Sequence, residues 1–257
     1  MKKLLSIIAI ILFSLSVNAQ EYKVLMSSGK LHIRGVNEVD IVGYNGNEVI
    51  ISKLGENGKD CDDEDDDRAK GLREINAAGA TDNTGVGLSA TQKGNELLLE
   101  QISNNNDSRF TIKVPKGVII FYEHSTHNGD LIRLKNIASE IEIDANYNDI
   151  EFENLTGPIA LNTVYGDIEG SFNKVSSTND IAIYSVYGYV DVTIPGSTKA
   201  DFRLSSSYGQ MFTDLNLDVL GSQKKDSKKI TGSLNGGGID FSIKASYDNI
   251  YLRKKKS

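Results

Sequence analysis

The sequence predicts an all-β protein that winds as a β-solenoid, with repeats of about 20 residues. Similar turn sequences recur at a nearly constant spacing, apolar and polar residues alternate between them, and no long stretch of helical periodicity follows residue 20. An antiparallel β-meander or sandwich is the alternative, because the same turn sequences also form hairpins. The constant spacing favours the solenoid, since a meander has no reason to restore the same turn in every repeat.

Six related turns mark the repeat, and each contains Gly, Asn or Asp, the residues that tolerate a positive φ. With Gly129 as the first marker and Gly209 as the fifth, the successive intervals are 19, 18, 22 and 21 residues. The last interval, from Gly209 to Asp248, is 39 residues and is close to two periods. The turns are HNGD at 127–130, YNDI at 147–150, YGDI at 165–168, YGYV at 187–190, YGQM at 208–211 and YDNI at 247–250.

Between the turns, apolar and polar residues alternate with the period of two that half-buried strands require. Ile141 and Ile143 are predicted to point inward while Glu140 and Glu142 point outward. Each repeat holds two such strands, and the regular repeats extend over about 118–252. Most carboxylates of this region are therefore explained as the solvated outer face of the strands.

Five tyrosines accompany the turns and are predicted to stack as a structural ladder along one edge. An exposed series of aromatic rings could instead serve as a sugar-binding platform, and covering the turn backbone is the favoured interpretation. Three aspartates also recur at the turns, where the capping of a backbone amide explains them. The tyrosines are Tyr147, Tyr165, Tyr187, Tyr208 and Tyr247, and the aspartates are Asp130, Asp149 and Asp167.

The first 19 residues have the order of a secretory signal peptide. Lys2 and Lys3 precede an apolar run that is too short for an ordinary membrane-spanning helix, and Val17-Asn18-Ala19 supplies the small residues of a cleavage site. Residues 20–257 are then expected to form a single exported β-repeat domain with no transmembrane segment. Its location would be the periplasm, the outer surface or the extracellular space.

An irregular, acidic insertion is expected at about 55–90, with one short helix near Ala69 to Ile75. Its acidic run is predicted to be a solvated loop, because it lacks the ligand spacing and the glycine of a calcium-binding loop. A calcium site is the alternative. The residues concerned are Asp60, Asp62, Asp63, Glu64, Asp65, Asp66 and Asp67.

The remaining motifs predict no cofactor, no metal centre and no catalytic residue. GVGLSA at 85–90 has the letters of a dinucleotide-binding turn but lacks the preceding strand and the following helix. His124 and His127 would face opposite sides of a strand and are expected to be surface residues. Cys61 has no partner for an internal disulfide. The net charge of −7, which becomes −9 without Lys2 and Lys3, argues against nucleic-acid binding.

The repeated [ST]-x-Y-G-D-I-x pattern, VDVTIP at 190–195, GGG at 236–238 and DNTGVGL at 82–88 resemble the bacterial putative adhesin family, whose members are β-strand-repeat proteins. The resemblance covers most of the chain beyond residue 19. It implies a right-handed, single-stranded β-helix-like fold in the cell envelope of Bacteroidetes-type bacteria. It supplies no catalytic residues.

The function expected from these observations is that of a non-enzymatic, adhesin-like binding module. Its partner would be an envelope protein or a glycan. Two alternatives remain open. One is a periplasmic partner of a sigma/anti-sigma signalling system, which the resemblance makes plausible. The other is a carbohydrate-active β-helix enzyme, which acids clustered on one face of the solenoid would support.

Overall fold

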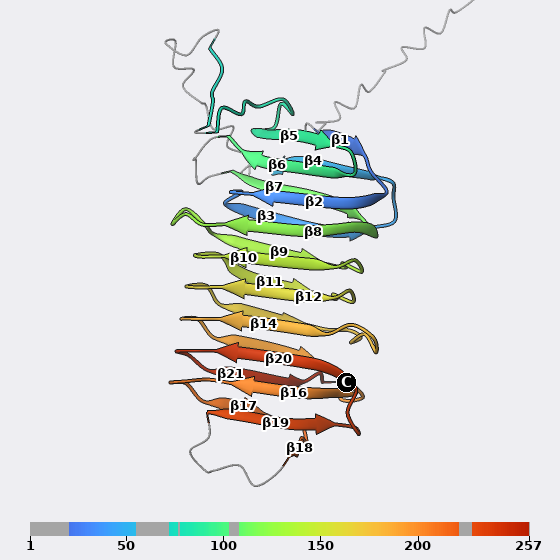
Figure 1. Ribbon diagram of the computed structural model, residues 1–257, viewed down its shortest axis with the longest axis vertical. Coiled ribbons are helices and arrows are strands. Elements are labelled where there is room, and N and C mark those ends of the chain that lie inside the picture. The colour runs from blue at the N-terminus through green and yellow to red at the C-terminus, as the bar shows by residue number, and fades with distance from the viewer. Residues whose placement is uncertain (1–20, 55–71, 77, 103–107, 221–227, 257) are drawn as a thin grey trace, which may run out of the picture.

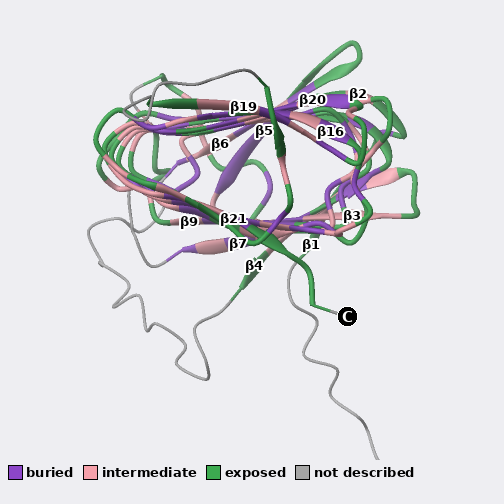
Figure 2. Ribbon diagram, turned by 90° about the horizontal axis from the view of Figure 1, so that it is seen from below, coloured by how far each residue is buried: buried purple, intermediate pink, exposed green. Residues whose placement is uncertain are grey.

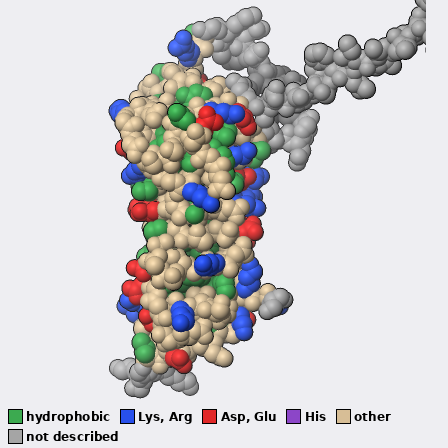
Figure 3. Space-filling view, turned by 90° about the vertical axis from the view of Figure 1, so that its right-hand side faces the viewer, with side chains coloured by type: hydrophobic (Ala, Val, Ile, Leu, Met, Phe, Trp, Pro, Cys, Tyr) green, Lys and Arg blue, Asp and Glu red, His purple; other side chains and the backbone are tan. Residues whose placement is uncertain are grey.

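Two β-sheets face each other along a rod and enclose one apolar core (Figures 1 and 2). The computed structural model describes residues 21–54, 72–76, 78–102, 108–220 and 228–256. Over these residues every regular element is a β-strand. Charged side chains of both signs are spread along the length of the rod (Figure 3). The all-β prediction is confirmed.

Sheet A contains ten strands. In spatial order they are β1 (Glu21–Leu25), β4 (Glu48–Leu54), β7 (Arg109–Pro115), β3 (Glu38–Tyr44), β9 (Leu131–Lys135), β11 (Asp149–Glu153), β13 (Ile168–Ser171), β15 (Val190–Ile194), β21 (Ile250–Lys254) and β17 (Met211–Thr213).

Sheet B contains eleven strands. In spatial order they are β18 (Asp218–Val219), β19 (Lys229–Leu234), β16 (Ala200–Ser205), β20 (Ile239–Ala245), β14 (Ile181–Ser185), β12 (Ile159–Thr163), β10 (Ile141–Ala145), β8 (Gly117–His124), β2 (Ser28–Arg34), β6 (Glu96–Gln101) and β5 (Leu88–Lys93).

From β8 to β15 the chain alternates between the two sheets, and each strand pairs in parallel with the strand that occupies the same place one coil later. In sheet B, Ile141 pairs with Ile159, and Ile159 pairs with Ile181. The apolar positions therefore form continuous buried rows inside the rod, as the alternation in the sequence predicts. Antiparallel pairing occurs at the two ends, in β1–β4–β7, β5–β6 and β16–β19–β18, so both sheets are mixed.

Outside the segment from β8 to β15, the coils do not stack in chain order. The late strands β20 and β21 lie between β14–β15 and β16–β17, and the early strands β2 and β3 lie between β6–β7 and β8–β9. The spacing cannot reveal this order, because every repeat presents the same inward pattern and fits any neighbour in register. Segments distant in sequence therefore complete the rod at both ends.

The glycines of the tyrosine turns are needed for close backbone approach, and the expected positive φ is wrong for them. A Cβ atom on Gly166 would lie 1.9 Å from the carbonyl oxygen of Asn148, and one on Gly188 would lie 2.1 Å from that of Gly166. The positive φ values of the central coils occur in the turns at the opposite edge, at Asn136 and Asn154. The tyrosine turns are therefore stacked too tightly for a side chain to enter.

The Ser or Thr of the [ST]-x-Y-G pattern joins consecutive turns. The hydroxyl of Thr163 donates to the carbonyl of Asn148 in the preceding coil (2.9 Å) and accepts from the N–H of Gly166 in its own turn (3.2 Å). The hydroxyl of Ser185 repeats both contacts one coil later. Buried turn backbone is satisfied in this way, which explains why a hydroxyl residue stands three positions before the glycine.

The predicted insertion is shorter than expected. Residues 88–90 already belong to β5, which pairs with β6, so the irregular segment ends before Leu88. The described part of the predicted helix, residues 72–75, is not helical, and Ile75 forms an isolated antiparallel bridge with Thr81. The apolar alternation of LSATQK is too brief to distinguish a strand from a loop by sequence.

A buried polar cluster joins the early coil of β2 and β3 to the central coils. His124 is 3 % exposed, and its Nε2 lies 3.0 Å from Oδ1 of Asn37. The amide of Asn148 donates to the carbonyl of Asn37 (2.9 Å) and to the hydroxyl of Tyr122 (3.2 Å). The Tyr122 hydroxyl donates to the carbonyl of Val36. The expectation that His124 is a surface residue is therefore wrong.

Burial lowers the pKa of the His124 imidazole, so acid should destabilise the fold. The neutral ring contributes stability above the unfolded pKa of 6.5, and this contribution is lost as the pH falls toward the lower folded pKa. Below the unfolded pKa, protonation of His124 should lower the free energy of unfolding by at most about 1.4 kcal/mol per pH unit. The chain should therefore be less stable at about pH 5.5 than at about pH 7.5. Urea unfolding at both pH values measures the loss.

The matched control uses the other histidine of the H-x-x-H pair, His127, which is exposed. His124→Gln should flatten the pH dependence of the unfolding free energy, and His127→Gln should leave it as in the parent chain. Equal slopes for the two variants would contradict the assignment to His124.

Candidate functional site

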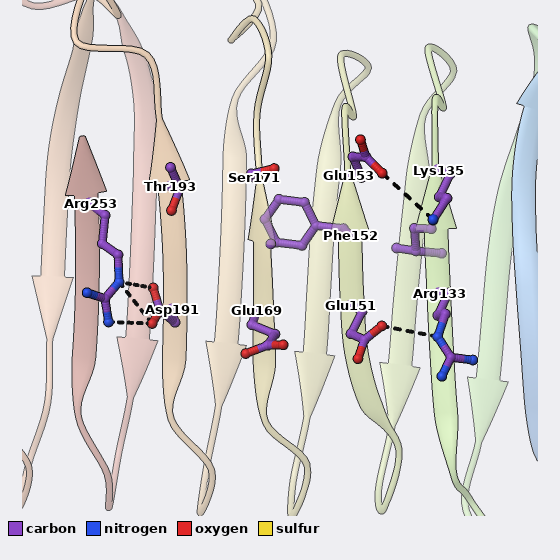
Figure 4. Close-up of a pocket in the computed structure, with 12 residues that line it drawn as sticks. Arg133, Lys135, Glu151, Phe152, Glu153, Glu169, Ser171, Asp191, Thr193 and Arg253 are labelled. Atoms are coloured by element: carbon purple, nitrogen blue, oxygen red, sulfur yellow. Dashed lines mark hydrogen bonds and ion pairs between the residues drawn. The ribbon is translucent and has the colours of Figure 1, made fainter. Parts of the chain in front are cut away.

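A groove of about 450 Å³ runs along the outer face of sheet A and crosses several coils (Figure 4). We call it the sheet A groove. Its side chains come from β9, β11, β13, β15 and β21, which lie next to one another in the sheet. Its lining residues are Arg133, Leu134, Lys135, Glu151, Phe152, Glu153, Glu169, Gly170, Ser171, Asp191, Thr193 and Arg253.

The groove is made of two rows of outward side chains held in register by parallel pairing. Arg133 pairs with Glu151, Glu151 with Glu169, and Glu169 with Asp191. Adjacent members of a row are therefore about 4.8 Å apart at the backbone. The second row lies two residues further along the same strands. A straight ligand that crosses the strands would meet one side chain of each row per coil.

Ion pairs occupy both ends of the groove (Figure 4). The Arg133 Nε atom lies 3.1 Å from Glu151 Oε2, and the Lys135 ammonium lies 3.7 Å from Glu153. At the other end, the Arg253 guanidinium contacts both carboxylate oxygens of Asp191, at 2.7 Å each. These cations neutralise the carboxylates beside them.

Among the described residues, no cation lies within ion-pair distance of Glu169, which stands in the middle of the groove. Its Oε2 accepts a hydrogen bond from the hydroxyl of Tyr189 at 3.2 Å. Burial, together with the charges of Glu169 and Asp167, raises the pKa of Tyr189 to about 12, so that the phenol remains a donor. The small side chains of Ser171 and Thr193 leave open space beside the carboxylate. The centre of the groove therefore presents negative charge that the residues described in the structure do not neutralise.

The alternating pattern places Glu151 and Glu153 on the solvated outer face, and no sequence motif singles out the rest of the groove. A usable signal was present: Glu151, Glu169 and Asp191 each stand three residues after a turn marker. Such a fixed offset places side chains in one row of a solenoid, and only the pairing register shows which rows form a concave surface. No group of three or more potential metal-ligating side chains occurs among the described residues.

The five predicted tyrosines form one continuous stack at the turn edge of the rod. Neighbouring rings are nearly parallel, with centroids 4.7 to 4.9 Å apart. The spatial order differs from the chain order, because Tyr247 lies between Tyr187 and Tyr208. The rings are 42 % to 70 % exposed, since each presents its edge to solvent.

The turn carboxylates bind the next coil through its backbone. The Oδ1 atom of Asp149 accepts from the N–H of Asp167 at 2.8 Å, and that of Asp167 accepts from the N–H of Tyr189 at 2.9 Å. Desolvation raises the pKa of Asp167, and the nearby charges of Asp149 and Asp248 add to the shift. Among the described residues, the Asp130 carboxylate forms no comparable contact.

The other sequence motifs do not join the sheet A groove. The GVGLSA segment follows Asp82, whose carboxylate accepts from the N–H groups of Thr84, Gly85 and Gly87. The segment then enters strand β5, which is not the helix that a dinucleotide turn requires. The proposed signal peptide, Cys61 and the acidic run from Asp60 to Asp67 lie outside the described residues.

The family model described as Toastrack DUF4097 matches residues 125–253, which include the groove and the whole tyrosine stack. The chain belongs to the Toastrack DUF4097 family. This agrees with the resemblance to putative adhesins found in the sequence. No curated protein matches the chain.

Two solved structures resemble this Toastrack chain at low sequence identity. One is a putative cell adhesion protein from Clostridium sporogenes, with 13 % identity, a TM-score of 0.44 and coverage of 92 % of this chain and 100 % of the other. The other is a putative adhesin from Bacteroides fragilis, with 12 % identity, a TM-score of 0.44 and coverage of 93 % and 98 %.

The part of the chain that the structure describes contains no helix with the length and apolar character needed to span a membrane.

Proposed function

We propose that this Toastrack chain is a non-enzymatic, adhesin-like binding module, exported to the cell envelope or secreted, and that the sheet A groove is its binding face. The observation that supports this most directly is the central carboxylate of Glu169, which has no cationic partner in the described part of the chain, whereas Glu151 and Asp191 beside it each have one. A ligand with an ammonium or guanidinium group would supply the missing charge. Coils of about 20 residues, which the spacing of the turns predicts, and their right-handed winding, which the family resemblance implies, are part of the same proposal.

The shape of the groove favours a polymer. It crosses five strands, so its length is about four strand spacings, or roughly 19 Å. Hydroxyl and carboxylate side chains repeat along it, and a chain of sugar or peptide units could contact several coils at once. Repetition of weak polar contacts is how extended repeat surfaces bind their partners.

The test uses oligomers of glucosamine, which carry one amino group per sugar. We expect the purified chain to bind them in calorimetry without releasing new reducing ends, and Glu169→Gln to weaken binding about tenfold, the loss of one charge-assisted hydrogen bond. Glu142→Gln, an exposed carboxylate of sheet B, is the matched control and should bind as the parent chain does. Unchanged affinity in Glu169→Gln, or no binding by the parent chain, would refute the proposed groove.

A carbohydrate-active enzyme is the second candidate, because Glu151, Glu169 and Asp191 stand on adjacent strands at a spacing that glycoside hydrolysis can use. The same experiment separates the two functions. Release of reducing ends that Glu169→Gln abolishes would assign an enzyme. Binding without turnover supports the adhesin-like module.

We also propose that the tyrosine stack is structural. Each interior ring is covered on both faces by its neighbours, so the faces that a sugar would use are occupied. Because the rings are about half exposed, the loss on truncation should be smaller than for a buried aromatic residue. Tyr165→Ala, which removes two ring contacts, should lower the unfolding free energy by about 2 kcal/mol.

Tyr208 ends the stack and contacts one ring, so Tyr208→Ala should lose about half as much as Tyr165→Ala. Thermal or urea unfolding measures both. A Tyr165→Ala chain with unchanged stability and lost binding of a neutral glycan would instead assign the stack as the binding platform.

A further inference from the structure

A second groove, of about 310 Å³, lies on the outer face of sheet B toward the end of the rod formed by β16, β19 and β20. It is separate from the sheet A groove, because the two open on opposite sheets. Three of its lining residues, Arg203, Lys229 and Lys244, are cationic, and none is acidic. This local charge is notable in a chain with a net charge of −7.

The strand register places the cations around a small hydroxyl residue. Ser205 on β16 pairs with Lys244 on β20 and with Lys229 on β19. The two lysines therefore flank Ser205 from the adjacent strands, with their backbones roughly 10 Å apart. Arg203 stands two residues before Ser205 and faces the same side of the sheet. The result is a shallow cationic cup whose floor is a serine.

Two further contacts shape the cup. Nη2 of Arg203 donates to Oδ1 of Asp240 at 2.9 Å, an ion pair that orients the guanidinium and offsets part of its charge. Tyr184 pairs with Lys244 on the next strand and is 38 % exposed, so an aromatic ring forms one side of the cup. The hydroxyls of Ser205 and Ser242 line it as well.

We propose that this cup binds a uronate sugar of an acidic glycan. The ammonium of Lys244 and the N–H donors of Arg203 that Asp240 does not accept match a carboxylate, the serine hydroxyls match sugar hydroxyls, and the ring of Tyr184 suits the apolar face of a sugar. An anionic membrane is the less favoured partner, because the net negative charge of the chain opposes its approach to a broad negative surface, whereas a single sugar meets only the local cations.

The experiment measures binding of trigalacturonate and of neutral maltotriose to the full chain by calorimetry, at about 0.02 M and about 0.3 M sodium chloride. We expect trigalacturonate to bind and maltotriose to bind much less, with affinity falling at the higher salt. Lys244→Gln and Arg203→Gln should each weaken trigalacturonate binding about tenfold. Both side chains are exposed, and unchanged melting temperatures would show that the variants fold.

Two controls separate this site from the rest of the surface. Lys135→Gln removes a cation of the sheet A groove, and Glu169→Gln removes the central carboxylate of that groove; both should bind trigalacturonate as the parent chain does. Loss of binding in Lys135→Gln, equal binding of the neutral and acidic sugars, or no binding at all would overturn the proposal. Sedimentation with phosphatidylglycerol vesicles that depends on Lys244 and Arg203, without trigalacturonate binding, would assign the cup to a membrane instead.

Discussion

Gly166→Ala is expected to lower the free energy of unfolding by about 3 kcal/mol, the upper part of the range for overpacking a dense site. The added Cβ would lie 1.9 Å from the carbonyl oxygen of Asn148, and that oxygen belongs to turn backbone. The same oxygen accepts the hydroxyl of Thr163, so the turn cannot shift without breaking a buried hydrogen bond. For a chain of this size the melting temperature should fall by roughly 10 °C.

The control substitution is Gly232→Ala in β19. Its added Cβ would lie 3.1 Å from the nearest atom, the carbonyl oxygen of Asp218, which a small adjustment relieves. We expect Gly232→Ala to change the stability by less than about 1 kcal/mol. Similar losses in the two variants would show that turn stacking is not what requires glycine at Gly166.

Phe241→Ala is expected to cost about 4 kcal/mol, the value typical of a fully buried aromatic side chain. Phe241 is 0 % exposed, and its ring packs on Phe202 at 5.0 Å and against Phe172 at 5.9 Å. It belongs to β20, which lies between β14 and β16. The cavity would therefore open at β20, where this late strand packs between the earlier strands β14 and β16.

Phe212→Ala provides the comparison for this prediction. Phe212 also stacks on an aromatic ring, that of Tyr251, with centroids 5.2 Å apart, but it is 45 % exposed on the edge strand β17. Its removal should cost about 1 kcal/mol. Urea unfolding of the two variants and the parent chain tests whether the burial of Phe241 accounts for its larger loss of unfolding free energy. Losses of equal size would contradict this role of burial.

Gly166 and Phe241 meet different requirements of the same stacking. At the tyrosine edge, coils approach so closely that only glycine fits, and hydroxyls of Ser and Thr satisfy the turn backbone. In the interior, coils from distant parts of the chain are joined by aromatic packing. Disruption of either should loosen the sheet A groove, since its rows depend on the register of neighbouring coils.

Much of the repeat region could be predicted from the sequence. Alternation of Ile141 and Ile143 with Glu140 and Glu142 correctly predicts which side chains are buried in β10. The [ST]-x-Y-G pattern correctly locates the turns. The prediction that His124 lies on the surface is wrong, because the cluster with Asn37 and Asn148 joins residues more than 80 positions apart in the chain. No local pattern reports such a contact.

The strand pattern, the place of the tyrosine turns and the family could all be predicted before the structure, because they depend on local alternation and on short motifs. The order of the coils became apparent only in three dimensions, where β20–β21 lie between β14–β15 and β16–β17, and the order of the tyrosines follows from it. The tertiary structure also decided which outward residues meet as the sheet A groove and the cationic cup on sheet B. The physical reason is that repeated strands are interchangeable in local pairing, so their order depends on contacts between distant segments, such as Phe241 with Phe202, which local patterns do not encode.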